Sequence, residues 1–301
     1  IFRNCQYWGA RDECKFCDIN ENARQMKLSR DFTLAAPVKS VEDVVRVCEE
    51  VTSDARRLGV AAPGFVLSGG SITKTLHCKS EVDFYEEYIR AIKGSSAKPR
   101  ITFEVNARPR EEVKRYKAAG ADNIHFNMEV WDRRLFEWIN PGKAERVGWD
   151  NWVRWMCDAV EVFGPGNVQP SFVSGVEMAR PHGFQSVDEA VKSTSGCFEY
   201  LMSRGILPRP QQWRRDGVDY HRPLLAIPDL VLYYRAVMGQ VLIISHVWWV
   251  PRPIQGAPTL GLFPSPEFAA NVGDNIQNRA GWPSSAKDPA LTLAQPFMTD
   301  A

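Results

Sequence analysis

Three cysteines near the start of the chain have the type and spacing that chemistry at a metal requires. Cys5, Cys14 and Cys17 form a C-x8-C-x2-C pattern between a predicted strand and a predicted helix. Three thiolates on one loop can hold three irons of a [4Fe-4S] cluster and leave the fourth iron open to a small-molecule ligand. The pattern therefore predicts an iron–sulfur site with an open position for reaction.

Zinc is the main alternative for these thiols, and unrelated thiols are the other. A structural zinc ion usually takes four Cys or His ligands, and no fourth ligand lies near the loop at the usual spacing, since His77 and Cys78 come much later. The four remaining cysteines are scattered and are predicted to be structural: Cys48, Cys78, Cys157 and Cys197. Seven cysteines so distributed do not indicate a disulfide framework, and they predict one cluster only.

Composition narrows the class of protein. The 301 residues are 44% hydrophobic and include ten Trp and fifteen Phe, which excludes a mainly disordered chain. The 37 basic and 36 acidic residues give a net charge of +1, so no overall field attracts nucleic acid. No apolar run approaches the ~20 residues that span a bilayer. We therefore expect a cytoplasmic protein with no nucleic-acid partner and no membrane span.

Strands and helices are predicted to alternate along the first two thirds of the chain. The predicted strands are 1–4, 64–67, 100–105, 123–130 and 167–176. The predicted helices are 40–58, 82–93, 110–119, 150–163 and 186–204, the first with Ser40 as its N-cap. This rhythm is typical of α/β proteins with a parallel sheet and helical crossovers, and it fits a barrel or an open sheet.

The pattern weakens after about residue 208, which divides the chain into two predicted regions. Residues 1–207 would form the core, and 208–301 would supply the last core elements and an irregular closing segment rich in Pro and Trp. Within the second region we expect a helix near 228–238 and a strand near 241–250.

The cysteine motif resembles that of the radical S-adenosylmethionine (SAM) superfamily. Cys14-Lys15-Phe16-Cys17 has the aromatic residue before the last cysteine that is typical of these enzymes. The first gap is eight residues, whereas the usual motif has three. The resemblance covers about residues 1–205 and is closest to the branch of biotin synthase and the hydrogenase maturases.

Further motifs follow in the order that this family shows. Ser68-Gly69-Gly70-Ser71 resembles the glycine-rich motif that binds the SAM amino group. Asn127 and Glu129 resemble the pair that contacts the SAM ribose or methionine, and Lys143 falls where relatives place a base for the methionine carboxylate.

The last of these motifs lies at the end of the fifth predicted strand. Gly175 and Glu177 resemble the residues of the family that end this strand beside the adenine and ribose of SAM. As an ordered set the motifs are specific, whereas each glycine motif alone is weak.

The resemblance implies a complete or partial (β/α) TIM-type barrel and a defined chemistry. Cys5, Cys14 and Cys17 would ligate one [4Fe-4S] cluster, and SAM would bind its open iron. An electron from an external flavodoxin or ferredoxin would cleave SAM to a 5′-deoxyadenosyl radical, which takes hydrogen from a small-molecule substrate. Biosynthesis of a cofactor, pigment or metabolite is the expected setting.

Several other side chains have two interpretations. Glu104 and Asn106 end the third strand and face either substrate or SAM, or are rim residues bonded to neighbours. His125 lines the barrel or is a buried, satisfied histidine. The remaining candidates are aromatic residues for shielding or core packing, and arginines for an anionic substrate or a solvated loop: Tyr7, Trp8, His246, Trp248, Trp249, Arg214, Arg215 and Arg222.

Two alternatives to a radical SAM enzyme stay open from the sequence. One is a non-catalytic iron–sulfur or zinc protein on a barrel scaffold, which would transfer electrons or bind a partner. The other is a degenerate barrel that binds SAM without cleaving it.

Overall fold

The computed structural model describes residues 1–10, 12–20, 38–212, 233 and 236–238. Its strands are β1 (Phe65–Leu67), β2 (Ile101–Glu104), β3 (Asn123–His125), β4 (Ser171–Ser174) and β5 (Arg209–Gln212). They pair in parallel as β1-β2-β3 and as β4-β5. Parallel bridges from Ile124 to Val168 and from Glu129 to Phe172 join the two groups, so neighbouring strands follow chain order.

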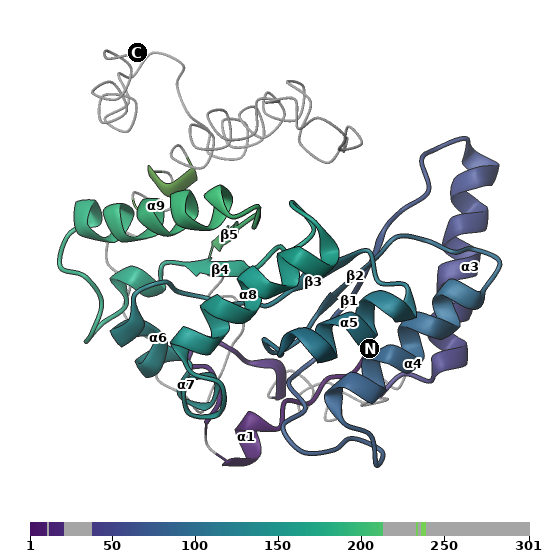
Figure 1. The fold of residues 1–301 in the computed structure, drawn as a ribbon, viewed down its shortest axis with the longest axis horizontal. Coiled ribbons are helices and arrows are strands. Elements are labelled where there is room, and N and C mark those ends of the chain that lie inside the picture. The colour runs from purple at the N-terminus through teal and green to yellow at the C-terminus, as the bar shows by residue number, and fades with distance from the viewer. Residues whose placement is uncertain (11, 21–37, 213–232, 234–235, 239–301) are drawn as a thin grey trace, which may run out of the picture.

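Helices alternate with these strands, as expected of an α/β fold (Figure 1). They are α1 (Tyr7–Ala10), α3 (Val41–Leu58), α4 (Glu81–Gly94), α5 (Arg110–Ala119), α6 (Arg133–Ile139), α7 (Pro141–Arg146), α8 (Trp149–Phe163), η2 (Val176–Met178, a 3₁₀ turn) and α9 (Val187–Ser203). In series, α3 packs on α4, α4 on α5 and α5 on α8, which makes one layer beside the strands. The described strands do not close into a barrel.

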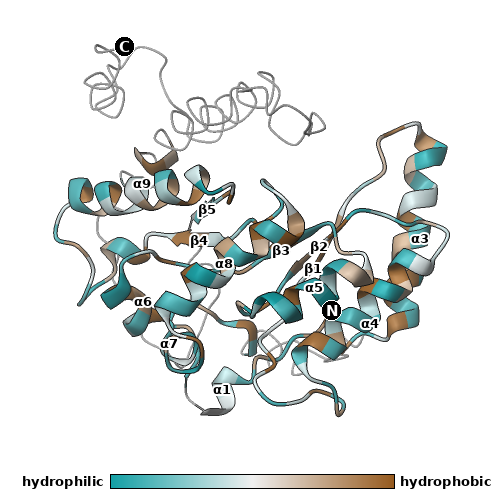
Figure 2. Cartoon of the chain, in the orientation of Figure 1, coloured by the Kyte–Doolittle hydropathy of each residue, from teal (hydrophilic) through white to brown (hydrophobic). Residues whose placement is uncertain are grey.

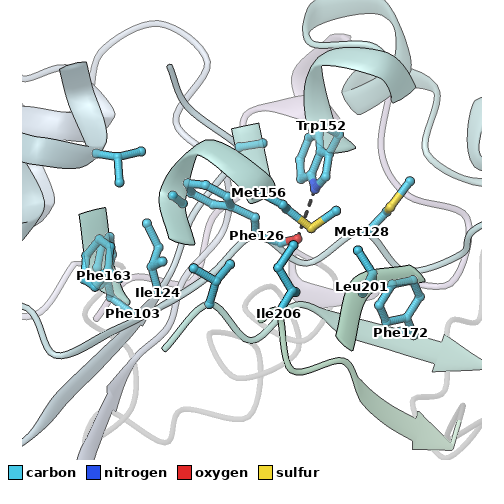
Figure 3. Close-up of a cluster of buried hydrophobic side chains, with 14 of the residues drawn as sticks. Phe103, Ile124, Phe126, Met128, Trp152, Met156, Phe163, Phe172, Leu201 and Ile206 are labelled. Atoms are coloured by element: carbon cyan, nitrogen blue, oxygen red, sulfur yellow. Dashed lines mark hydrogen bonds between the residues drawn. The ribbon is translucent and has the colours of Figure 1, made fainter. Parts of the chain in front are cut away.

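The core lies between this helical layer and one face of the strands (Figure 3). Phe103 of β2 and Ile124 of β3 are register partners, and both are completely buried on that face. Trp152 of α8 is also completely buried, and its indole Nε1 donates to the carbonyl oxygen of Phe126 at 3.0 Å. Side chains one residue along each strand point to the opposite face, where Glu104 and His125 lie side by side.

Local signals that the sequence carries explain where several helices begin and end. Ser40 caps α3 by accepting the amide of Asp43 at 3.0 Å, as predicted. Ser186 and Glu189 form a capping box at the start of α9. Gly120 ends α5 with φ +109°, a conformation that favours glycine.

The helices contain both hydrophobic and hydrophilic residues along their length, as expected of amphipathic helices that pack on one side (Figure 2). Among the described residues, no helix has both the length and the apolar character that crossing a bilayer requires.

The structure corrects several predicted elements. Residues 1–4 form no strand, because Phe2 makes only an isolated antiparallel bridge to Val38. The predicted strand 123–130 ends at His125, and 167–176 is a strand only from Ser171 to Ser174. Helices α6 and α7 were not predicted, although Asp132 caps α6 through the amide of Leu135 and Pro141 begins α7.

The region after residue 208 begins with an element of the sheet. Strand β5 pairs in parallel with β4 despite Pro210. The division of the chain at residue 207 stays a prediction. Tyr233 and 236–238 are helical, within the predicted helix 228–238. The rest of that helix, the predicted strand 241–250 and the closing segment lie outside the described residues.

Candidate functional site

The cysteine loop lies against the turn that follows β1. The sulfur of Cys5 accepts a hydrogen bond from the main-chain amide of Ser71 at 3.4 Å, and the carbonyl of Ser71 accepts the amide of Gln6 at 3.0 Å. The amide of Cys17 donates to the carbonyl of Cys14 at 3.0 Å, which forms a turn between those two cysteines. All seven cysteines lie within the described residues, and none is in a disulfide.

The three thiols are close enough to influence one another's charge, with Cys5 buried and Cys14 and Cys17 half-buried. Burial raises the pKa of Cys14, which the charge of Lys143 opposes and the nearby Cys17 and Cys5 reinforce. Burial also raises the pKa of Cys17 to about 11, with a contribution from Cys5. Because coordination deprotonates a thiol, a metal centre here would supply the positive charge that thiolates need.

The chemistry of this donor set fits an iron–sulfur cluster. Three cysteines of one loop can each bind a different iron of a [4Fe-4S] cluster. Among the described residues, no three His, Cys, Asp or Glu side chains converge on a position that could hold one metal ion.

The two glycines of the glycine-rich turn allow a close approach of the chain to itself. A Cβ atom on Gly70 would lie 2.4 Å from the carbonyl oxygen of Asn4 and 2.5 Å from the Cα of Cys5. A Cβ atom on Gly69 would lie 2.4 Å from the ring of Phe2. The structure thus gives these glycines a packing reason, which is separate from the predicted contact with the SAM amino group.

Glu129 and Lys143 form a buried pair. The ammonium of Lys143 donates to Oε1 of Glu129 at 2.6 Å and to the carbonyl of Asn127 at 2.7 Å, and it lies 5.0 Å from the ring centre of Trp152. Glu129 has a positive φ of 74°, which is rare for a residue with a side chain. This backbone conformation lies at the point where Glu129 forms its bridge to Phe172.

The charges of this pair are linked to the cysteine loop. Burial lowers the pKa of Lys143, but Glu129 and then Cys14 raise it by more, so the amine stays protonated. Burial raises the pKa of Glu129, and Lys143 opposes that shift. The sequence predicted a separate contact with SAM for each of these two residues, whereas in the structure they bond to each other beside the thiols.

A second polar group lies at the ends of β1, β2 and β3. Ser68 donates through its hydroxyl to Oε2 of Glu104 at 2.5 Å, and Nδ1 of His125 lies 3.5 Å from Oε1 of Glu104. Burial raises the pKa of Glu104, but its polar contacts with His125, Ser68 and Asn127 outweigh burial and lower the pKa overall. Glu104 is therefore a carboxylate at neutral pH.

Gly175 and Glu177 lie in a different environment. Glu177 accepts hydrogen bonds from the amide of Gly175 at 3.2 Å and from the hydroxyl of Thr194 in α9 at 3.3 Å. The hydroxyl of Tyr233 lies 2.8 Å from that of Thr194. These contacts hold Glu177 against α9, apart from the hydrogen bonds of the cysteine loop. Its role toward adenine and ribose stays a prediction.

The other candidates divide between buried neighbours and positions that the structure does not describe. Tyr7 is 2% exposed and donates to Asn106, so it is a core residue. Asn106 is bonded to neighbours, and the sequence did not indicate its partner Glu81. The candidates outside the described residues are Arg214, Arg215, Arg222, His246, Trp248 and Trp249.

Solved structures of low sequence identity share this fold. Methylornithine synthase matches over 81% of this chain and 60% of its own, with a TM-score of 0.52 and 13% identity. The [FeFe]-hydrogenase maturase HydG matches over 76% and 47%, with a TM-score of 0.51 and 16% identity. HydG from Carboxydothermus hydrogenoformans matches over 78% and 49%, with a TM-score of 0.51 and 15% identity. The chain has the fold of these radical SAM enzymes.

Sequence comparison adds one local match. A segment of 63 residues, 21% of this chain, is 32% identical to bacteriochlorophyllide c C-7(1)-hydroxylase of Chlorobaculum limnaeum, and it spans 16% of that protein. No family model matches the sequence. The resemblance that the cysteine motif indicated is thus confirmed at the level of the fold, and radical SAM enzymes use a [4Fe-4S] cluster and SAM.

Proposed function

We propose that this chain is a radical SAM enzyme that acts on a small-molecule substrate. One observation carries the proposal: the thiols of one loop interact electrostatically with the buried Glu129–Lys143 pair, beside the ends of parallel strands. When bound, the cluster and SAM would supply a 5′-deoxyadenosyl radical, after an external donor provides one electron and the sulfur–C5′ bond breaks to release methionine.

The chain's own residues would bind and orient these groups. Cys5, Cys14 and Cys17 would hold the cluster, and burial of their loop would keep water from it. Lys143 and Glu129 would face the carboxylate and the amine of the methionine part of SAM, because they carry the complementary charges beside Cys14. Ser68, Gly69, Gly70, Ser71 and Asn127 complete the proposed SAM site, and Gly175 and Glu177 its adenine side.

The wider architecture that we propose is a partial (β/α) barrel. Five parallel strands in chain order support it, and residues after 212 would supply its closing elements. A flavodoxin or ferredoxin as electron donor, a role in biosynthesis and a cytoplasmic location belong to the same proposal.

Anaerobic reconstitution followed by reduction with dithionite in the presence of SAM tests the function. We expect close to four irons and four sulfides per chain, and release of 5′-deoxyadenosine. Cys14→Ala should lose most of the iron, because one of three cluster ligands is gone. Cys197→Ala is the control, since Cys197 is a free thiol too but is completely buried in α9.

The outcomes separate the alternatives. An intact cluster with no 5′-deoxyadenosine, with or without candidate substrates, would contradict the enzymatic function and favour electron transfer. SAM binding without cleavage would favour a degenerate barrel. Equal iron content in Cys14→Ala and the native chain would remove the cysteine assignment itself.

A further inference from the structure

A chain of buried hydrogen bonds leads from the cysteine loop to α4. At its centre is Asn106, which is 5% exposed and follows the end of β2. Its side-chain oxygen accepts the hydroxyl of Tyr7 at 3.2 Å and the hydroxyl of Ser71 at 3.3 Å. Its side-chain nitrogen donates to Oε1 of Glu81 at 3.0 Å. All hydrogen-bonding atoms of the carboxamide except one N–H therefore have a partner.

Glu81 anchors this chain of bonds at its far end. It is 2% exposed, and its Oε1 also accepts the main-chain amide of Ile72 at 3.0 Å. Its Oε2 accepts two hydrogen bonds from the guanidinium of Arg108, at 3.1 Å from Nε and 2.7 Å from Nη2. Oε2 is therefore held by Arg108 and Oε1 by Ile72 and Asn106, so both oxygens of the carboxylate are fixed in position.

The segment held by these bonds is the one that contacts the cluster loop. Ser71 is fixed through its hydroxyl to Asn106, and its neighbour Ile72 is fixed through its amide to Glu81. The main-chain amide of the same Ser71 donates a hydrogen bond to the sulfur of Cys5 at 3.4 Å. The side chain of Gln6 accepts the amides of Thr73 and Lys74, each at 2.8 Å, and so ties the two loops together again.

We propose that Asn106 and Glu81 are positioning residues that set the reduction potential of the cluster. This inference rests on the proposed function, because it concerns the cluster that Cys5 would ligate. Hydrogen bonds to the sulfurs are among the features that tune such potentials. An N–H directed at a thiolate stabilises the more negative, reduced cluster, so the Ser71 amide raises the potential and makes reduction easier.

Asn106→Ala tests the proposal by removing the central acceptor while keeping all three cysteines. The reconstituted variant should load iron, and its equilibrium constant for one-electron reduction should fall about tenfold, a shift of about 59 mV to more negative potential. The measurement is a redox titration followed by the electron paramagnetic resonance signal of the reduced cluster. Asn167→Ala is the matched control, because in the described part of the chain its carboxamide bonds only to the carbonyl of Phe163 at the end of α8.

A milder pair of variants covers the case in which Asn106→Ala does not fold. Ser71→Ala deletes only the hydroxyl that Asn106 holds and keeps the amide, so it should shift the potential in the same direction by a smaller factor. Ser71→Thr keeps a hydroxyl at this position, so its cluster should have the reduction potential of the native chain. Potentials equal to that of the native chain in every folded, loaded variant would overturn the inference.

The failure of this inference is distinguishable from failure of the proposed function. A native chain that takes up no iron, or that holds a cluster but never cleaves SAM, counts against the function. A native chain that loads a cluster and cleaves SAM, together with an unshifted potential in folded Asn106→Ala and Ser71→Ala, counts against the positioning role alone.

Discussion

The two groups of strands each bury a glutamate, but in opposite surroundings. On the side of β1, β2 and β3, Glu81 bonds to a guanidinium, a carboxamide and an amide. On the side of β4 and β5, Glu177 bonds to an amide and a neutral hydroxyl, and no cation is among its hydrogen-bond partners in the described residues. Burial raises the pKa of both, and Arg108 opposes that rise at Glu81 only.

This difference shows that a buried glutamate can have a charged partner or neutral partners only. Glu81 is held by the guanidinium of Arg108 and can serve as a rigid anchor for the turn after β1. The pKa of Glu177 rises to about 7, so the same side chain in the other group changes charge near neutral pH. The cysteine loop is built on the side whose buried carboxylate is paired.

The largest expected effect is on stability when the paired glutamate loses its charge. Glu81→Gln removes the closer of the two carboxylates that pair with Arg108, since Glu112 stays 3.7 Å from the guanidinium, and we expect the free energy of unfolding in urea to fall by about 3 kcal/mol. This value is at the lower end of the range for breaking a buried ion pair, because the Arg108 side chain is 25% exposed. Asp54→Asn, which breaks an exposed pair with Arg57, is the control and should cost less than about 1 kcal/mol. If Glu81→Gln and Asp54→Asn cost the same free energy of unfolding, the buried pair of Glu81 would be no more important than an exposed one, and the contrast with Glu177 would not hold.

The next effect is a pH dependence that belongs to Glu177. Its folded pKa, about 7, lies above the ordinary value of 4.5, so the folded state binds the proton more tightly than the unfolded state. Stability from this group is therefore present below pH 4.5 and is lost as the pH rises through 7, by about 3 kcal/mol in total.

Unfolding in urea at pH 5, 6, 7 and 8 measures this loss. Glu177→Gln keeps the size of the side chain and removes the titration, so its stability relative to the native chain should rise over that interval. A difference between the two chains that does not change with pH would mean that Glu177 is ionised throughout. Comparison with Glu81→Gln sharpens the contrast, because that variant should be less stable than the native chain at pH 7 and 8.

The smallest effect should be the same in both groups. Ser40 caps α3 and Ser186 caps α9, and replacing either by Ala should lower the free energy of unfolding by about 1 kcal/mol. Thermal unfolding of Ser40→Ala and Ser186→Ala measures both costs. If the two substitutions cost similar free energies, the two groups of strands differ at their buried glutamates and not in overall stability. A large disagreement between the two costs would indicate that the groups differ in general rigidity.

Local patterns in the sequence were sufficient for the elements that depend on local bonds. The helix that begins after Ser40, the end of α5 at Gly120 and the grouping of Cys14 and Cys17 all follow from neighbouring residues. The predicted strands were too long, because apolar runs continue past the last paired residue into buried loops such as Phe126 and Met128.

The contacts among the proposed site residues could not be predicted from the sequence, and the roles of these residues stay a proposal. Glu129 and Lys143 were each chosen from a motif, yet their contact depends on the approach of α7 to the segment after β3. Glu81 reads as an ordinary acidic residue in the first turn of a helix, since nothing local indicates that Arg108 will meet it. Such partners become visible only when tertiary structure brings distant segments together.

The contact between Gly70 and Cys5 has a consequence for how the protein is made. Cys5 is synthesised sixty-six residues before Ser71, the donor to its sulfur, and earlier still than Asn106 and Arg108. In a ribosome-bound chain, the three thiols are therefore synthesised long before the residues that surround them in the folded protein. Insertion of the proposed cluster into its completed site would therefore follow translation of the segment through Arg108, and a metal bound earlier would meet a loop without its hydrogen-bond partners.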